Sequence, residues 1–474
     1  MYDVAIIGAG VIGAAVAREL SKYELRIAVV EKELDACAAT SRANSGIVHS
    51  GFDATENTLM AKLNVLGNPM FDDLCEQLNV PFKRNGSLVV AFDDIQMEQL
   101  ERLKQRGSNN GVTGLRILSK EELFRKEPNI NPAALGALFA ETAGIVDPML
   151  LTFSLLESAV INGAETFFDF EVLAIKRMDS AWIINSQNHS ILAKIVINAA
   201  GLYSDKIHNM VSTPLFTINP VRGQYYLLDK SEGGLVTSTI FPCPTKAGKG
   251  ILVAPTMHGN IITGPTSEKI SGKEDVSTSN DMLNNVRLGA RLLVPGLKIN
   301  SIRDFAGLRA EPSSGDFVIG EVSGAVNFIN AAGIKSPGLS AAPAIAEYIV
   351  NILKNKDIEM EPKTSFEPAV SRKLFIEMSE QEQYDNIEQN PLYGRVICRC
   401  ENITEGDIVD SIWRSPGAVT IDGVKLRCRA GMGRCQSGFC GPKVQQILAR
   451  ELNKPIDEIV LNKKGSYILT GRTK

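Results

Sequence analysis

The stretch DVAIIGAGVIGAAVARELSK, residues 3–22, decides the fold of the first part of this 474-residue chain. It opens with a short apolar run of strand type, then three glycines, then a run of helical character. Gly8 permits a tight turn, Gly10 lets backbone approach a phosphate, and Gly13 lets the helix pack closely on the strand. The helix N-terminus offers free N–H groups to an anion. The pattern therefore predicts a dinucleotide-binding βαβ unit.

The next predicted strand, RIAVVEK at 26–32, ends on an acidic residue where such units bind ribose. Glu31 is expected to accept hydrogen bonds from an adenosine ribose. These glycines alone do not distinguish FAD from NAD. The loop at 40–51 is polar and rich in small residues, so it suits a flat ring system. Predicted cofactor contacts in these segments are Gly8, Gly10, Ile12, Gly13, Glu31, Lys32, Ser41, Asn44, Ser45 and Gly46.

This loop and later segments carry a family resemblance. TSRANSGIVHSGFD, then LMAKLNV and PFKRNGSLVVAF, resembles the D-amino-acid-oxidase-like flavoproteins. Within them it is most similar to bacterial FAD-dependent glycerol-3-phosphate dehydrogenases and 2-hydroxyglutarate oxidases. INAAGLYSD at 197–205, GLR at 307–309 and NAAGIKSPGL at 330–339 resemble further flavin motifs of this superfamily. The resemblance implies FAD, with further contacts at Val172, Ala200, Gly201, Gly333, Ser336, Gly338, Leu339 and Ser340.

Five of the eight cysteines lie in the last 77 residues, as Cys398-Arg-Cys400, Cys428 and Cys435-x4-Cys440. Such pairs suit a soft metal centre, whereas disulfides are not expected without a secretory signal. Zinc is the alternative, but structural zinc sites favour Cys-x2-Cys. The segments CRCENITEGDI and CRAGMGRCQSGFCGP resemble the bacterioferritin-associated-ferredoxin-like (BFD-like) [2Fe–2S] module. That resemblance makes Cys398, Cys400, Cys435 and Cys440 the ligands. For Cys428 we favour packing near the cluster, with ligation as the alternative.

The expected fold class is α/β with an α+β substrate domain. It combines a Rossmann-like FAD-binding domain of the D-amino-acid-oxidase/glutathione-reductase type, a mixed-sheet substrate domain and a small helical C-terminal [2Fe–2S] domain. The expected boundaries are 1–82, 144–213 and 305–364 for the FAD-binding domain, 83–143 and 214–304 for the substrate domain, 365–393 for a linker, and 394–474 for the BFD-like domain.

Oxidising an alcohol needs a base for the hydroxyl proton and an acceptor for the hydride. His49 lies in the flavin-lining loop, so it is the candidate base; a plain hydrogen bond to cofactor or backbone is its alternative. By the resemblance Arg309 faces the substrate, with a structural ion pair as its alternative. Lys335 and Arg222 are candidate anion partners, although Lys335 could point to solvent. His258, in a predicted turn between strands, is expected to be exposed.

The resemblance implies oxidation of sn-glycerol 3-phosphate to dihydroxyacetone phosphate. Hydride would go to flavin N5, and electrons would leave singly through the cluster. L-2-hydroxyglutarate or an amino acid such as proline is an alternative substrate, and a non-enzymatic electron-transfer flavoprotein is an alternative function. The expected partners are a polyol phosphate or hydroxy acid substrate and a protein electron acceptor, such as a second flavoprotein subunit in a hetero-oligomer.

The net charge is −4 and no long basic run occurs, so nucleic acid is not an expected partner. No signal peptide and no apolar stretch of about 18 residues are found. We therefore expect a cytoplasmic protein, with attachment to the inner face of the membrane left open.

Overall fold

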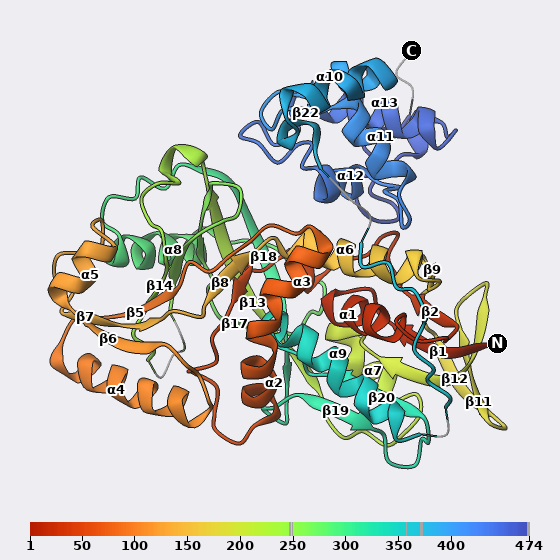
Figure 1. The fold of residues 1–474 in the computed structure, drawn as a ribbon, viewed down its shortest axis with the longest axis horizontal. Coiled ribbons are helices and arrows are strands. Elements are labelled where there is room, and N and C mark those ends of the chain that lie inside the picture. Colours follow the sequence, from red (N-terminus) through yellow and green to blue (C-terminus); the bar gives the residue numbers. More distant parts are fainter. Residues whose placement is uncertain (246–247, 249, 357, 370–372, 472–474) are drawn as a thin grey trace.

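The structure, a computed structural model, describes residues 1–245, 248, 250–356, 358–369 and 373–471. Two large sheets form the body of the molecule, and a small helical domain lies on top of it at the C-terminal end of the chain (Figure 1). This arrangement confirms the predicted fold class. Within the described residues no helix is long and apolar enough to span a membrane.

The first sheet is built on the predicted βαβ unit. β1 (Tyr2–Ile7) pairs in parallel with β2 (Ile27–Val30) and with β12 (Ser190–Asn198). β12 in turn pairs in parallel with β20 (Phe328–Ala332). The sheet thus joins strands from three distant parts of the chain. Its other strands are β9 (Glu165–Phe167), β10 (Ala174–Met178), β11 (Ala181–Asn185) and β19 (Val318–Glu321).

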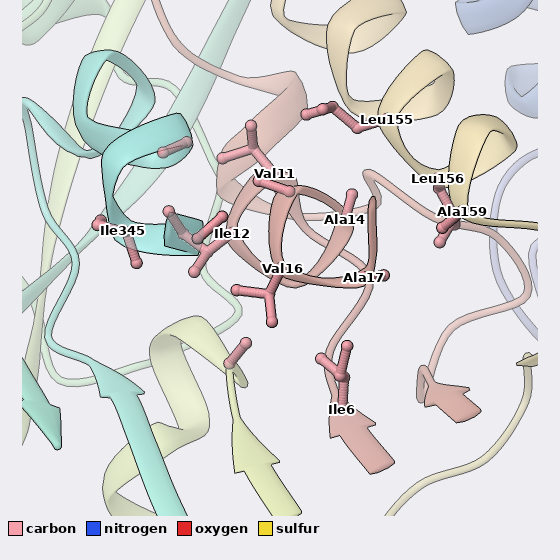
Figure 2. Close-up of a cluster of buried hydrophobic side chains, with 14 of the residues drawn as sticks. Ile6, Val11, Ile12, Ala14, Val16, Ala17, Leu155, Leu156, Ala159 and Ile345 are labelled. Atoms are coloured by element: carbon pink, nitrogen blue, oxygen red, sulfur yellow. The ribbon is translucent and has the colours of Figure 1, made fainter. Parts of the chain in front are cut away.

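Helix α1 (Val11–Leu20) is the centre of the largest core. It packs between α6 (Pro148–Ile161) and α9 (Gly338–Lys354), as Figure 2 shows with Ile12 beside Ile345. A Cβ on Gly13 would lie 1.9 Å from the Gly8 carbonyl oxygen. Only glycine therefore allows α1 to sit this close to the turn after β1, as the sequence predicts.

The second sheet, which belongs to the predicted substrate domain, is mixed. Its longest ladder joins β13 (Ile218–Leu228) and β18 (Ser301–Pro312). The predicted domain boundary at Asp304 falls inside β18, and the chain stays in this sheet to Pro312. The other strands are β5 (Ser87–Ala91), β6 (Leu115–Ser119), β7 (Gly136–Ala140), β14 (Thr239–Pro242), β15 (Leu252–Pro255), β16 (Ile261–Gly264) and β17 (Glu268–Lys269).

A small three-stranded sheet connects the two halves. β3 (Ile47–Val48) and β4 (Phe82–Lys83) both pair with β8 (Gly144–Val146). The helices that surround the two large sheets are α2 (Leu59–Gly67), α3 (Phe71–Leu78), α4 (Asp94–Asn109), α5 (Lys120–Lys126), α7 (Ser204–His208) and α8 (Asn280–Leu293).

The C-terminal domain begins earlier than predicted. The expected linker 365–393 contains α10 (Glu380–Gln389), whose N-terminus Ser379 caps, and its residues 370–372 lie outside the described residues. Phe375 stacks on Tyr393, so this segment packs on the domain. The other elements are β21 (Val396–Cys398), β22 (Ile403–Thr404), α11 (Glu405–Trp413), α12 (Ile421–Cys428) and α13 (Gly441–Glu451).

Helix α12 of the C-terminal domain lies against α6 of the FAD-binding half (Figure 1). Ion pairs hold this domain to both halves of the body. On the first half they are Arg427–Asp35, Arg414–Glu157, Arg42–Asp422 and Lys464–Asp169, and on the second half Lys230–Glu401 and Arg434–Asp229.

Candidate active site

A cavity of about 950 Å³ lies where the three domains meet. Gly8, Gly10 and Glu31 line one part of it, and residues 40–46 line another. Gly8 has a φ of +107°, and a Cβ there would lie 2.5 Å from the Ala199 carbonyl oxygen. The turn therefore requires glycine and leaves its backbone open to the cavity. A cavity of this size suits a large cofactor.

The start of α1 forms the floor of the cavity. Gly10 caps the helix in an extended conformation, and the Val11 N–H donates to Ser41 Oγ at 2.9 Å. Ser41 thus stands at the end of the helix dipole, where an anion is stabilised. Two predicted cofactor residues of this segment do not line the cavity: Ile12 lies in the core, and Gly13 serves helix packing.

Glu31 organises the neighbouring turn. Its carboxylate accepts the Ala9 N–H at 2.9 Å and the Glu33 N–H at 3.0 Å. Burial raises the pKa of this carboxyl above its usual value, although the two backbone hydrogen bonds oppose the rise. Lys32 ion-pairs with Glu274 of the other half at 3.3 Å. The predicted contacts Val172, Ala200 and Gly201 line the same part of the cavity.

The loop at 40–46 is shaped by its own side chains. Asn44 Nδ2 donates to the Ser41 carbonyl oxygen at 2.8 Å, and its Oδ1 accepts the Gly46 N–H at 2.9 Å. Gly46 has a φ of +65°, and a Cβ there would lie 2.4 Å from the Val146 carbonyl oxygen. Asn44 therefore holds the loop in shape, and Ser45 joins it in lining the cavity.

His49 follows β3, where the FAD-binding half meets the second sheet. Its N–H donates to Ser340 Oγ at 2.7 Å, and its carbonyl oxygen accepts from Asn68 Nδ2 at 3.0 Å. The imidazole lies 5.9 Å from the Phe241 ring of the second sheet. Because Ser340 is in the first turn of α9, the helix N-terminus meets the segment that carries His49.

Arg309 lies on β18 opposite Val221 of β13. Its Nη2 donates to the Thr266 carbonyl oxygen at 3.3 Å. Burial raises the pKa of the Tyr225 hydroxyl, and the guanidinium of Arg309 beside it opposes this rise. Tyr225 shares a buried cluster with Phe241, the ring that contacts His49. Sequence reasoning missed Tyr225 and Phe241, because nothing in their local pattern distinguishes them from other strand aromatics.

The two residues predicted to bind a substrate anion, Lys335 and Arg222, are both ion-paired. Lys335 pairs with Glu311, and only 18% of its side chain is exposed, so the solvent-pointing alternative is wrong. Glu311 is two residues beyond Arg309 on β18, so both side chains leave the same face of the strand. Arg222 pairs with Glu268 and Asp275 and is 9% exposed.

Arg222 is held by neighbouring polar groups. Two carboxylates and the hydroxyl of Ser277 contact its guanidinium. Like His49, Arg309 and Lys335, Arg222 does not line the cavity, and its role as a substrate ligand stays a prediction. The predicted cofactor residues near Lys335 also lie outside the cavity lining: Gly333, Ser336, Gly338, Leu339 and Ser340.

These five residues nevertheless surround the start of α9. Gly338, Leu339 and Ser340 form its first turn, whereas Ser336 is exposed. Ser340 Oγ accepts from His49, as described above, and is 3.4 Å from the Ile47 carbonyl oxygen. A role in cofactor binding for this group stays a prediction.

The four predicted cluster ligands come together as two pairs. Cys400 Sγ is 3.6 Å from Cys435 Sγ, and Cys398 is in hydrogen-bond contact with Cys440. The contact with Cys440 lowers the pKa of Cys398 to about 6, while burial opposes the shift. Among the described residues no three potential ligands form one tight group. Two thiolate pairs suit a two-iron cluster, in which each iron takes two protein ligands.

The structure corrects the expectation for His258. It lies in the predicted turn between β15 and β16, but its Nε2 is 2.8 Å from Asp147 Oδ2 and only 23% of the side chain is exposed. Asp147 also caps α6 through the Met149 and Leu150 N–H groups. Burial would raise the pKa of Asp147, but the contact with His258 lowers it below its usual value.

Two family models match the chain. The FAD dependent oxidoreductase (DAO) model matches residues 3–352, and the BFD-like [2Fe-2S] binding domain model matches residues 396–450. A glycerol 3-phosphate dehydrogenase of Caloramator mitchellensis is 52% identical over all of this chain and 99% of its own length. The chain belongs to the glycerol-3-phosphate dehydrogenase family of FAD-dependent oxidoreductases.

Two more distant relatives match part of the chain. The dithionite-reduced L-α-glycerophosphate oxidase of Mycoplasma pneumoniae with FAD bound superposes with a TM-score of 0.74 at 34% identity, over 78% of this chain and 99% of that one. The human mitochondrial L-2-hydroxyglutarate dehydrogenase is 32% identical over 56% of this chain and 61% of its own length. The non-enzymatic alternative is therefore wrong.

The residues present fit the two cofactors of this family. The open glycine turn, the α1 N-terminus and the adjoining loop suit FAD, and the two cysteine pairs suit a [2Fe–2S] cluster. The predicted cofactors are thus confirmed by the family matches. Cys428 shares a buried cluster with Cys398 and Cys440, and its Sγ contacts the Val424 carbonyl oxygen at 3.3 Å.

Proposed function

We propose that this protein oxidises sn-glycerol 3-phosphate to dihydroxyacetone phosphate and passes the electrons singly through its cluster to another protein. The main support for this substrate is the glycerol 3-phosphate dehydrogenase of Caloramator mitchellensis. It is 52% identical over the full length of this chain, which includes the cluster domain. The L-2-hydroxyglutarate relative is less similar and covers little more than half of this chain.

The proposed substrate site lies between β3 and the second sheet. His49 takes the proton of the secondary hydroxyl, and Ser340 and Asn68 hold the backbone that positions it. A histidine titrates near neutral pH, so it can act as a base under ordinary conditions. The Phe241 ring beside the imidazole helps to exclude water from this side.

Arg309 provides the fixed positive charge that a phosphate ester requires. Its fork of N–H donors can bind two phosphate oxygens, and Tyr225 lies beside it. Lys335 adds a second cation beside this face of β18, where Glu311 partly neutralises its charge. We include Lys335 because a substrate phosphate can compete with Glu311 for its ammonium group.

Bound FAD supplies a hydride acceptor at N5, and the [2Fe–2S] cluster supplies a one-electron outlet. Oxidation removes a hydride and a proton from the substrate, so two electrons must leave for each turnover. The chain carries one dinucleotide-binding glycine motif. We therefore propose an acceptor protein, such as a second flavoprotein subunit in a hetero-oligomer.

An anaerobic substrate screen tests the substrate. We expect glycerol 3-phosphate to bleach the flavin absorbance, and L-2-hydroxyglutarate and proline to leave it unchanged over the same time. Bleaching by either of the other two compounds, but not by glycerol 3-phosphate, would replace the proposed substrate. The Arg309→Lys variant keeps the charge but loses the fork, so its affinity for glycerol 3-phosphate should fall.

A further inference from the structure

A lysine of the cluster domain faces the dinucleotide cavity. Lys425 lies on α12, is 8% exposed, and lines the cavity together with Gly10 and Ser41. Among the described contacts its ammonium group has no hydrogen bond or ion pair. A cation so deeply buried is costly unless an anion compensates it.

The groups around Lys425 supply little of that anion. Arg303 and Arg42 are near enough to disfavour its charged form, whereas Asp422 and the Cys440 thiol favour it. Asp422 is already paired with Arg42 at 3.3 Å. Burial and these arginines lower the pKa of Lys425 to about 8. Two arginines that also line the cavity therefore lie near Lys425.

The position of Arg42 relates this group to the floor of the cavity. Arg42 directly follows Ser41, whose Oγ accepts the first N–H of α1. In a dinucleotide site the helix N-terminus receives the pyrophosphate. The cations from α12 and β18 thus lie on the side of the cavity where the cofactor's negative charge is expected.

We propose that the cluster domain completes the FAD site, with Lys425 reaching the FAD diphosphate and Arg42 and Arg303 supporting it. The site is then closed by a residue of the BFD-like domain, which lies outside the residues that the FAD dependent oxidoreductase model matches. Binding of FAD and docking of the cluster domain must be coupled, and by linkage each strengthens the other.

The test is the rate of FAD release from the intact holoprotein, followed by the rise of free-flavin fluorescence. We expect Lys425→Met to release FAD roughly tenfold faster or more, as for a lost charge-assisted contact. Lys425→Arg should restore slow release, and Lys454→Met, an exposed lysine of the same domain, should leave the rate unchanged. Arg303→Gln, at the exposed rim, should give a smaller increase.

Hydrogen exchange of the 421–428 amides gives a second readout. We expect these amides to be better protected with FAD bound than after FAD is removed, and Lys425→Met to reduce that difference. The proposal is overturned if Lys425→Met leaves the rate of FAD release unchanged. It is equally overturned if Lys425→Met changes only the substrate KM or only the cluster spectrum, which would assign the ammonium to the substrate phosphate or to Cys440.

Discussion

Arg427 of the cluster domain and Asp35 of the FAD-binding half form a buried two-point ion pair. Nη1 is 2.5 Å from Oδ2, and Nη2 is 2.7 Å from Oδ1. The guanidinium also lies 4.0 Å from the centre of the Phe153 ring on α6. This pair joins residues 392 positions apart in the chain. It is the contact that we expect to fix α12 on α6.

Removing one partner of this pair should destabilise the docked state strongly. Asp35→Ala leaves the Arg427 charge buried without its carboxylate, although the Pro416 and Gly423 carbonyl oxygens still accept from its guanidinium. The loss should be roughly 3–5 kcal/mol. Urea unfolding of the holoprotein measures it. The control Lys464→Ala breaks the more exposed pair with Asp169 and should cost about 1 kcal/mol or less.

An apolar replacement separates the charge effect from a loss of packing. The double variant Asp35→Leu/Arg427→Met should recover much of the stability lost in Asp35→Ala, because no unpaired charge remains. If the double variant is no more stable than Asp35→Ala, the loss comes from packing and our account of this contact fails.

Gly13→Ala should abolish FAD binding. The added methyl group would lie 1.9 Å from the Gly8 carbonyl oxygen, so α1 has to move away from the turn that lines the cavity. The FAD content of the purified protein measures the effect. Gly234→Ala is the matched control, because its Cβ would meet no atom within 4 Å. Normal FAD content in Gly13→Ala would refute the close approach.

His49→Gln should slow flavin reduction by glycerol 3-phosphate. The loss of a general base costs about 10²- to 10⁴-fold in rate. Stopped-flow absorbance under anaerobic conditions measures this step, and FAD content should stay normal. His189→Gln, at an exposed turn, serves as the control. An unchanged rate in His49→Gln would leave His49 with only the hydrogen-bonding role that the sequence leaves open.

Two cysteine variants separate ligation from packing. Cys435→Ser should lose the [2Fe–2S] absorbance, because Cys435 is one half of a thiol pair. Cys428→Ala should keep it, because that thiol donates to the Val424 carbonyl oxygen and is expected to be a packing residue. Both variants should still have their flavin reduced by substrate. Loss of the cluster in Cys428→Ala but not in Cys435→Ser would make Cys428 the ligand and Cys435 the packing residue.

Acid should weaken the link between Asp147 and His258. The folded state holds the pKa of Asp147 below its ordinary value, which is near 3.8. A depressed carboxyl pKa stabilises the folded state above the ordinary value, and this contribution disappears as the pH falls through the folded pKa. The stability advantage of the wild type over Asp147→Asn, which still caps α6, should therefore be constant near neutral pH and shrink below about pH 4.

Thermal unfolding at a series of pH values measures this advantage. Both proteins are best compared in the Cys435→Ser background, because the cluster itself is expected to be labile to acid. An advantage that does not change with pH would show that the charge of Asp147 does not contribute.

The sequence was sufficient for elements whose cause is local. The glycine motif at residues 8–13 predicts the turn, because only glycine allows the backbone conformation and the close helix approach required there. The start of α11 likewise has a local cause, because Thr404 and Asp407 form a full capping box there. The cysteine pairs are predictable from the sequence because side chains that bind one shared cluster have a restricted spacing.

Contacts between distant segments were not predictable from local patterns. His258 looks like an ordinary turn residue, and only the tertiary fold brings the turn between β15 and β16 to Asp147 at the start of α6. Arg222 looks like a free cation until β17 places Glu268 beside it. Lys425 has no distinguishing neighbours in sequence, and its position depends on the docking of a whole domain.

The central claim is that electrons from glycerol 3-phosphate pass through the flavin to the cluster of the same chain. Rapid-freeze EPR after anaerobic mixing with glycerol 3-phosphate tests it most directly. We predict that a reduced [2Fe–2S] signal appears as the flavin absorbance bleaches, and that Cys435→Ser bleaches without it. A bleached flavin beside a cluster that stays oxidised, but that dithionite reduces, would contradict the account.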